Sequence, residues 1–297
     1  MPQFLHQFLR HYLLALQFFS RVPVTGRLAA WVGFSPAMLR ASAAHFPGVG
    51  WLVGGVVALL SAALLTWLPV STFSPLVVAV LGTVVSVLMT GAFHEDGLAD
   101  VADGLGGTLD RDRALEIMKD SRVGAFGAIA VMLALLAKVS LLALLGAQGA
   151  GVLGVALFTA HVVSRTWPLF TIRLLPHVGD AAGSKSKPLA DQISGAALGV
   201  ACLWCFMALA LVVIVQNATY FIANPSAWRA SWLALAALLG AGLVASGLAW
   251  AWMARWFARR LQGFTGDCLG ATQQVCEISF YLGLALAWGA LQRGAGA

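Results

Sequence analysis

Long apolar runs dominate the chain and predict its architecture. They lack the alternation of apolar and polar residues that is typical of half-buried strands, and several reach the roughly 20 residues that a helix needs to cross a bilayer. Seven runs are predicted to span the membrane; six or eight spans are the alternatives, because the assignment at the two ends is open. The predicted spans cover about 48–68, 72–93, 124–146, 151–175, 196–216, 230–254 and 276–292.

The N-terminal segment differs from these runs. Residues 4–22 are apolar but carry His6, Arg10 and His11, and a helix of this composition is predicted to lie in the membrane interface. No linker, internal repeat or soluble domain stands out in the rest of the chain. The sequence therefore predicts an all-α, polytopic membrane bundle with an N-terminal interfacial helix, in which residues 1–297 form one domain.

Composition agrees with a membrane protein and gives its orientation. The chain is 60% hydrophobic and 10% charged, with a formal net charge of +6. This excess is attributed to the positive-inside bias and to anionic lipid headgroups, so no nucleic-acid partner is expected. Lys and Arg concentrate before the first span and in alternate connections, which are predicted to share the cytoplasmic side. These connections are 94–123, 173–195 and 255–275.

Acidic residues are placed even more unevenly, and they supply the first candidate site. Eight of the twelve lie within 94–123. Asp96, Asp100 and Asp103 are spaced i, i+4, i+7 and would form one stripe on a helix. Such carboxylates repel one another unless a cation neutralises them, and hard oxygen ligands favour Mg²⁺ or Mn²⁺. The pattern predicts a Mg²⁺ site of these three residues, the alternative being a solvated polar loop.

Residues on both sides of the stripe are further candidates. His94 is interpreted either as a general base or phosphate contact, or as a histidine that caps the interface. Residues 110–120 resemble a short amphipathic helix with Asp110 at its N-cap. After it come Asp120 and Arg122. Arg122 has the chemistry to clamp a diphosphate with two hydrogen bonds, and Asp120 is assigned to the substrate site.

Five more polar residues lie near or within apolar runs. Asp267 is predicted in a glycine-rich turn and Glu277 at a membrane entry, where acids are functional candidates. Both are assigned to the substrate site, the alternative being a helix-capping Asp267 and an interfacial Glu277. Lys138 is expected either to snorkel or to contact substrate, and Arg165 to face the bundle interior, where it would pair with an acid or a phosphate. Lys187 belongs to a flexible basic stretch that is interpreted as an ordinary loop or as a lid over an anionic substrate.

Together these features favour an enzyme. Carboxylates, glycines and a metal ion at a membrane surface suit phosphoryl transfer between a diphosphate and an alcohol. The metal would neutralise the diphosphate and stabilise charge on the leaving phosphate. The candidate catalytic residues are therefore His94, Asp96, Asp100, Asp103 and Arg122.

The chain resembles the cobalamin synthases, the adenosylcobinamide-GDP ribazoletransferases. The longest block of the resemblance is residues 91–107, which contains the pattern His-x-Asp-Gly-Leu-Ala-Asp-x-x-Asp-Gly. The other blocks are LQFFSRVPV (16–24), HFPGVGWLVGG (45–55), ALEIMKDSRVGAFG (114–127) and TGDCLGA (265–271), followed by Glu277. Two positions depart from the family pattern or lie outside it: Glu95 occupies a variable position, and Cys268 stands where Thr is commoner.

The resemblance implies a reaction and its partners. Such enzymes join α-ribazole or its 5′-phosphate to adenosylcobinamide-GDP with Mg²⁺, and they release GMP and adenosylcobalamin or its 5′-phosphate. This is a final step of cobalamin nucleotide loop assembly, expected here in a bacterial inner membrane with the active site facing the cytoplasm. Beyond these substrates and the bilayer, a homo-oligomer or contacts with other cobamide-assembly enzymes are left open.

Two rival functions use the same acidic residues. A CDP-alcohol phosphotransferase would share the reaction class, but it would need a further Gly-x-x-x-Asp-x-x-x-Asp continuation. After Asp103 the chain continues with glycines, and Asp110 and Asp112 are too close together for that spacing. A cation transporter or channel would place acids at the bilayer midplane, whereas the acids here are predicted at the ends of spans.

Overall fold

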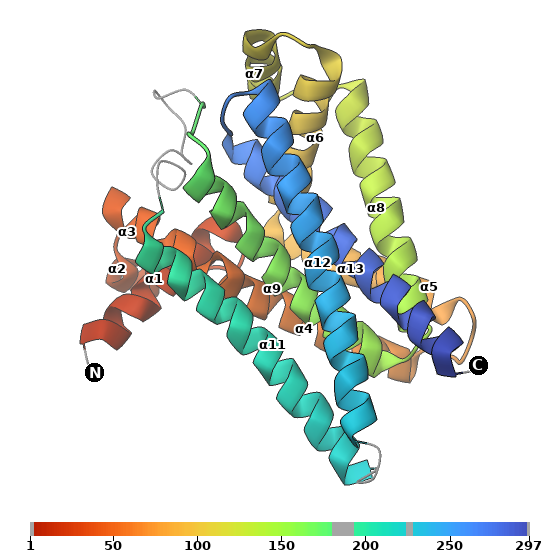
Figure 1. The fold of residues 1–297 in the computed structure, drawn as a ribbon. Coiled ribbons are helices and arrows are strands. Elements are labelled where there is room, and N and C mark those ends of the chain that lie inside the picture. The colour runs from red at the N-terminus through yellow and green to blue at the C-terminus, as the bar shows by residue number, and fades with distance from the viewer. Residues whose placement is uncertain (1–2, 180–192, 224–227, 296–297) are drawn as a thin grey trace.

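The computed structural model describes residues 3–179, 193–223 and 228–295, and helices make up nearly all of this part (Figure 1). The helices are α1 (Gln3–Phe19), α2 (Gly26–Val32), α3 (Pro36–Ser42), the 3₁₀ turn η1 (Ala43–His45), α4 (Phe46–Trp67), α5 (Ser74–Thr90), α6 (Phe93–Gly107), α7 (Arg111–Lys119), α8 (Ala125–Gly146), α9 (Ala150–Leu174), α11 (Gly195–Ala223), α12 (Trp228–Arg260) and α13 (Gly266–Ala295). The predicted all-α class is confirmed.

Six helical segments of the described chain are long and apolar enough to cross a membrane. They are 36–67, 125–146, 150–174, 195–218, 232–260 and 266–294. A seventh appears if α5 and α6 are counted as one broken span, because the two helices pass the same test together. The protein is therefore a multi-pass membrane protein, within the predicted range of six to eight spans. Helix α1 is not among the segments that qualify as spans, in agreement with the interfacial interpretation.

A sharp bend separates α5 from α6. The two helix axes differ by 88°, and the turn is made by Gly91 and Ala92, which both have left-handed backbone angles, φ 68° and 57°. A left-handed residue ends a helix because it cannot continue the right-handed path. The predicted span 72–93 therefore ends at Thr90. The segment after the bend is a 15-residue helix rather than a loop, and it carries the acidic stripe.

The last two helices are longer than the apolar pattern predicts. Helix α12 continues to Arg260, so the basic residues expected in a loop lie on its final turns. Helix α13 begins at Gly266, ten residues before the predicted span. The placement of Asp267 in a turn and of Glu277 at a membrane entry is therefore wrong: Asp267 lies in the first turn of α13, and Glu277 lies three turns inside it.

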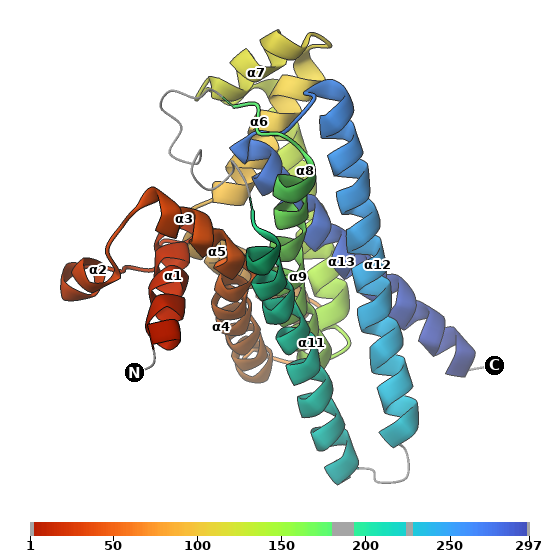
Figure 2. The same ribbon diagram turned by 60° about the vertical axis from the view of Figure 1, so that its left-hand side comes forward.

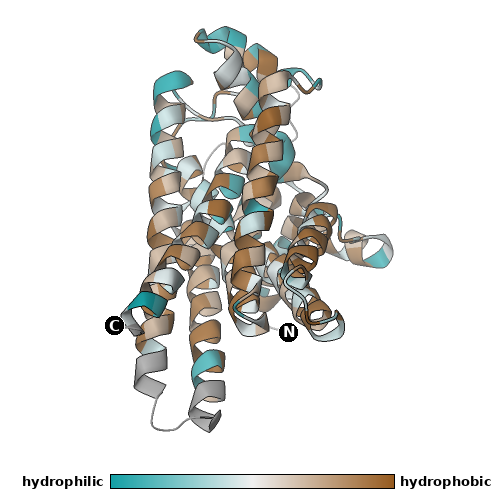
Figure 3. Cartoon of the chain, turned by 90° about the vertical axis from the view of Figure 1, so that its right-hand side faces the viewer, coloured by the Kyte–Doolittle hydropathy of each residue, from teal (hydrophilic) through white to brown (hydrophobic). Residues whose placement is uncertain are grey.

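Helix α9 forms the centre of the bundle. Its apolar window is 72% buried, whereas those of α8 and α11 are 17% buried, which leaves most of their surface for lipid. Helix α4 packs against α9 at close range, since a Cβ added at Gly50 would lie 2.9 Å from the backbone carbon of His161. Helices α6 and α7 lie at one end of the bundle (Figure 2). Hydrophilic residues are frequent at that end, and apolar residues cover most of the helix lengths (Figure 3).

Candidate active site

The acidic stripe of α6 meets the N-terminus of α13. Asp96 is exposed and Asp100 half-buried, and Asp267 is half-buried in the first turn of α13. Glycines allow this approach: a Cβ added at Gly97 would lie 2.7 Å from the carbonyl oxygen of Asp267, and one at Gly270 would lie 3.3 Å from the Cα of His94. Two segments about 170 residues apart in sequence thus bring their carboxylates together.

These carboxylates share one electrostatic environment. Asp100 lies within electrostatic reach of Asp267, Asp96 and Asp103, and each of them repels its negative charge. Asp96 acts on Asp267 in the same way. Within the described ranges, none of Asp96, Asp100 and Asp267 forms an ion pair with Lys or Arg. We call these three residues the acidic cluster.

Asp103 has a different environment from the rest of the stripe. It is 8% exposed, and its two carboxylate oxygens accept hydrogen bonds from the backbone N–H groups of Gly124 (2.7 Å) and Gly127 (2.8 Å). Those groups belong to the N-terminus of α8, where a carboxylate satisfies free donors and interacts favourably with the helix dipole. The structure thus shows Asp103 as the residue that holds α8 to α6.

The donor set of the acidic cluster fits a Mg²⁺ ion. In the described residues, no group of three or more His, Cys, Asp and Glu is arranged to hold a metal ion. Mg²⁺ does not require such a cage, since it commonly binds one or two carboxylates together with substrate phosphates and water. Asp96, Asp100 and Asp267 supply hard oxygen ligands without a competing cation. This donor set differs from the predicted one, because Asp103 accepts backbone hydrogen bonds from α8 and Asp267 takes its place.

Arg122 and Asp120 lie beyond the cluster on an exposed connection between α7 and α8. Arg122 forms an ion pair with Asp120, and its side chain is 87% exposed. The hydrogen bonds that Arg122 donates lower the pKa of Asp120 to about 2. The preceding α7 has the predicted form, with Asp110 accepting a hydrogen bond from the backbone N–H of Arg113 at 2.7 Å. Both Arg122 and Asp120 therefore face solvent, although Arg122 keeps a free side of its guanidinium for an anion.

His94 is turned away from the acidic cluster, between aromatic rings on one side and the charges of Arg165 and Glu277 on the other. It is 1% exposed and stacks on Phe46, with ring centroids 5.8 Å apart. Its Nε2 has no hydrogen-bond partner among the described residues. A pocket lined by His94, Phe46, Phe93 and Leu269 adjoins it. This pocket of about 30 Å³ is close to the volume of one water molecule, so it has no room for a substrate group beside His94.

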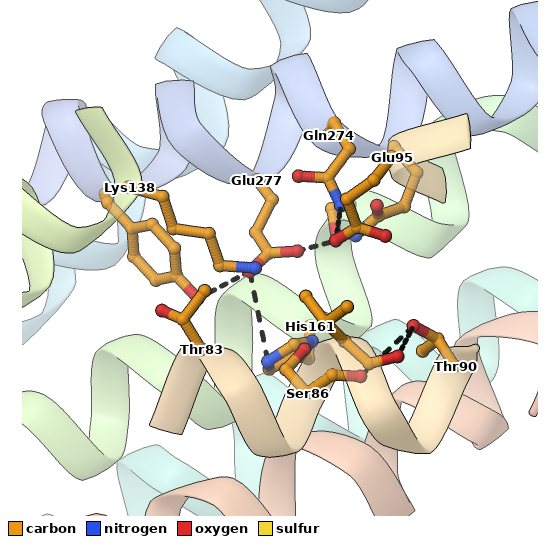
Figure 4. Close-up of polar contacts among 12 residues, drawn as sticks. Thr83, Ser86, Thr90, Glu95, Lys138, His161, Gln274 and Glu277 are labelled. Carbon is orange, nitrogen blue, oxygen red and sulfur yellow. Dashed lines mark hydrogen bonds and ion pairs between the residues drawn. The ribbon is translucent and has the colours of Figure 1, made fainter. Parts of the chain in front are cut away.

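A second polar group is buried deeper in the bundle (Figure 4). Lys138 of α8 and Glu277 of α13 form an ion pair with a 2.7 Å Nζ–Oε1 distance, and both side chains are 1% exposed. Glu277 also accepts hydrogen bonds from Gln273 (2.7 Å) and Tyr281 (2.9 Å). Lys138 therefore does not snorkel, because its ammonium group is held in the interior by a carboxylate.

The buried group continues into α9 and α6. Arg165 is 1% exposed and faces the interior as predicted. It forms no ion pair with an acid of the described residues and instead donates to the backbone oxygen of His161 at 2.8 Å. On α6, Glu95 accepts a hydrogen bond from Gln274 of α13 at 2.9 Å. We call Lys138, Glu277, Arg165 and Glu95 the buried ionic group. It places two positive beside two negative side chains, which limits the cost of burying charge.

Sequence reasoning gave Glu95 no role and passed over the hydrogen-bonding partners of Glu277. The spacing of polar residues within these helices could have indicated the buried contacts. Gln273, Glu277 and Tyr281 follow one another at intervals of four residues and share one face of α13, and His161 and Arg165 have the same spacing on α9. Polar residues at this spacing within an apolar helix indicate a buried polar face. Lys187, the remaining candidate, lies outside the described residues.

Comparison with known proteins gives a consistent result. Residues 11–285 match a family model described as cobalamin-5-phosphate synthase. The chain is 72% identical to an adenosylcobinamide-GDP ribazoletransferase of Albidiferax ferrireducens, over 94% of this chain and 99% of the relative. Relatives with the same name from Polaromonas naphthalenivorans and Vibrio cholerae are 59% and 40% identical, over 94% and 91% of this chain and 99% and 91% of their own. No solved structure matches.

Proposed function

The chain belongs to the cobalamin-5-phosphate synthase family, and we propose that it catalyses the adenosylcobinamide-GDP ribazoletransferase reaction at the acidic cluster, with Mg²⁺. The substrates are adenosylcobinamide-GDP and α-ribazole or its 5′-phosphate. The products are GMP and adenosylcobalamin or its 5′-phosphate. Neither rival function, lipid headgroup transfer or cation transport, corresponds to the names of the relatives.

The observation that carries the proposal is the meeting of α6 and α13. Asp96, Asp100 and Asp267 are brought together at a contact made by glycines, with no Lys or Arg paired to them in the described chain. Keeping like charges close together costs free energy unless a cation and its ligand offset it. A Mg²⁺ ion would supply the cation, and the substrate diphosphate would supply the remaining oxygen ligands.

In the reaction, a ribazole hydroxyl oxygen forms a bond to the phosphorus that carries the adenosylcobinamide. The bond from that phosphorus to the oxygen of GMP breaks, and GMP leaves with the bonding electron pair. When bound, Mg²⁺ supplies electrostatic stabilisation of the charge on the diphosphate. The carboxylates of the acidic cluster would hold the Mg²⁺ that binds the diphosphate, and one of them would accept the hydroxyl proton.

Other residues act at a distance from the reacting atoms. Asp103 fixes α6 against α8 through its bonds to Gly124 and Gly127, so it positions the stripe. Arg122 is exposed at the same end of the bundle and is placed to meet a phosphate as substrate arrives. Basic residues on this side, such as Arg111, Arg259 and Arg260, support a cytoplasmic orientation in a bacterial inner membrane.

The test is turnover by the purified protein in lipid nanodiscs. With adenosylcobinamide-GDP, α-ribazole 5′-phosphate and Mg²⁺, we expect equal amounts of GMP and corrinoid product by chromatography, and we expect chelation of divalent ions to stop both. A parallel reaction offers a CDP-alcohol and a second alcohol. Release of CMP there, with no corrinoid product, would overturn the proposal in favour of lipid headgroup transfer. If corrinoid product still forms at the full rate when divalent ions are chelated, the proposal that the reaction needs Mg²⁺ is wrong.

A further inference from the structure

A basic groove lies on the same side of the fold as the acidic cluster but is made by other elements. Two adjoining hollows, of about 600 and 770 Å³, share Arg40 of α3 and Arg173 of α9 in their linings. These volumes are in the range of small-molecule sites. The first hollow extends between α1, η1 and the start of α11, and the second follows the chain from Ile172 to His177.

The fixed charge of the groove is positive. Arg40 and Arg173 are both exposed, and neither side chain forms an ion pair or hydrogen bond with another residue of the described chain. No Asp or Glu is among the described residues that line either hollow. Burial, together with the neighbouring Arg10, lowers the pKa of His11, so the positive charge near neutral pH comes from the two guanidinium groups.

An aromatic wall closes one side of the first hollow. Phe8 and His45 line it and meet edge to face, with ring centroids 4.7 Å apart. Trp204 stands behind them and donates a hydrogen bond from Nε1 to His45 Nδ1 at 3.2 Å. His45 is 3% exposed and Phe8 is half-buried, so the ring surface beside the two arginines is that of Phe8. An apolar ring next to guanidinium groups suits a ligand with both an aromatic ring and a phosphate.

The second hollow lies beside the segment that follows α9, which pairs with the residues just before α13. Beside its lining residue His177, the backbone N–H of Val178 donates to Phe264 at 2.9 Å, and Phe264 donates to Pro176 at 3.0 Å. Phe264 precedes Asp267 by three residues. The segment that follows α9 and the residues that precede α13 are thus paired, which places the groove and the first turn of α13 on neighbouring parts of the chain.

We propose that this groove is the subsite for the 5′-phosphate of the ribazole acceptor, with Arg40 and Arg173 as its ligands. This inference rests on the proposed function. Of the two substrates, the phosphorylated acceptor carries a phosphate group that takes no part in the reaction. Such a group needs a cationic site away from the carboxylates and their metal. The guanidinium groups of Arg40 and Arg173, which have no partner among the described residues, provide it by charge-assisted hydrogen bonds.

The experiment compares two acceptors with one enzyme. The variant Arg40→Gln/Arg173→Gln is assayed in nanodiscs with α-ribazole 5′-phosphate and with α-ribazole, and Arg27→Gln is the control because Arg27 is also exposed and basic but does not line the groove. Two lost charge-assisted contacts predict a fall of about 100-fold in kcat/KM for the phosphorylated acceptor relative to α-ribazole. The control is expected to keep the wild-type ratio.

Other outcomes overturn the inference and remain distinct from failure of the proposed function. An equal loss with both acceptors would show a structural role, and a raised KM for adenosylcobinamide-GDP would assign the groove to the nucleotide. If the ratio of kcat/KM for α-ribazole 5′-phosphate to that for α-ribazole is unchanged in the double variant, the groove binds no acceptor phosphate. If the ratio changes only in vesicles that contain phosphatidylglycerol, and not in phosphatidylcholine alone, the groove binds lipid headgroups. Failure of the proposed function would instead appear as no turnover of either acceptor by the wild-type protein.

Discussion

At the scale of single residues, the three acids of the α6 stripe have two different roles that their regular spacing does not indicate. Asp96, Asp100 and Asp103 follow one helical stripe, so the sequence presents them as equivalent. The structure separates them, because Asp103 accepts two backbone N–H bonds from α8 while Asp96 and Asp100 face Asp267. Sequence alone could not make this distinction, since the donors are more than 20 residues away.

Replacing Asp103 by Ala tests the structural role. The change removes the side chain that caps α8 and leaves two backbone donors without a carboxylate, so we expect a loss of about 1–2 kcal/mol in the free energy of unfolding. Denaturant unfolding in detergent measures it, with the exposed Asp112→Ala as control. Wild-type stability combined with a weaker apparent affinity for Mg²⁺ would show that Asp103 is a metal ligand and not a cap.

The buried pair of Lys138 and Glu277 gives a second prediction at this scale. Lys138→Met or Glu277→Gln alone should reduce the free energy of unfolding by about 3–5 kcal/mol, because each leaves a buried charge without its partner. The double variant should regain more than half of that loss. The same unfolding experiment, arranged as a double-mutant cycle, gives the coupling energy. Strictly additive losses would mean that the two side chains do not interact.

At the scale of elements, the site depends on how closely α6 and α13 approach. The pattern of apolar residues predicted the positions of these two segments along the chain, but it did not predict that they touch. It ended a span at residue 93 and started the last one at 276, because glycines and acids interrupt the hydrophobic runs there. In the structure those same residues are helical, and the glycines are what allow the two helices to touch.

The variant Gly97→Ala should disturb this contact. Its methyl group would lie 2.7 Å from the carbonyl oxygen of Asp267, so α6 and α13 must separate. We expect a loss of about 1–3 kcal/mol in stability and at least about a 10-fold fall in turnover, since small displacements of reacting groups are costly. Gly107→Ala on the same helix is the control, because its nearest neighbour would be at an ordinary 3.8 Å. Equal behaviour of the two variants would contradict the close-contact account.

At the scale of the whole molecule, composition and the positions of apolar runs were enough to predict an all-α, multi-pass membrane protein. The resemblance blocks, which extend from residue 16 to Glu277, pointed to the family that the comparisons then matched over residues 11–285. The three-dimensional pairing could not be predicted: Lys138 with Glu277, Glu95 with Gln274, and α6 with the start of α13. These contacts depend on tertiary packing between distant helices.

The central claim is that the acidic cluster is the reaction site, and turnover by Asp100→Asn tests it most directly. The variant removes one carboxylate charge from the cluster with almost no change in shape. GMP release in nanodiscs at saturating Mg²⁺ should fall by about 100-fold or more, while the unfolding midpoint stays near the wild-type value and Asp112→Asn remains fully active. Turnover by Asp100→Asn within a few-fold of wild type would contradict the claim and move the chemistry away from α6.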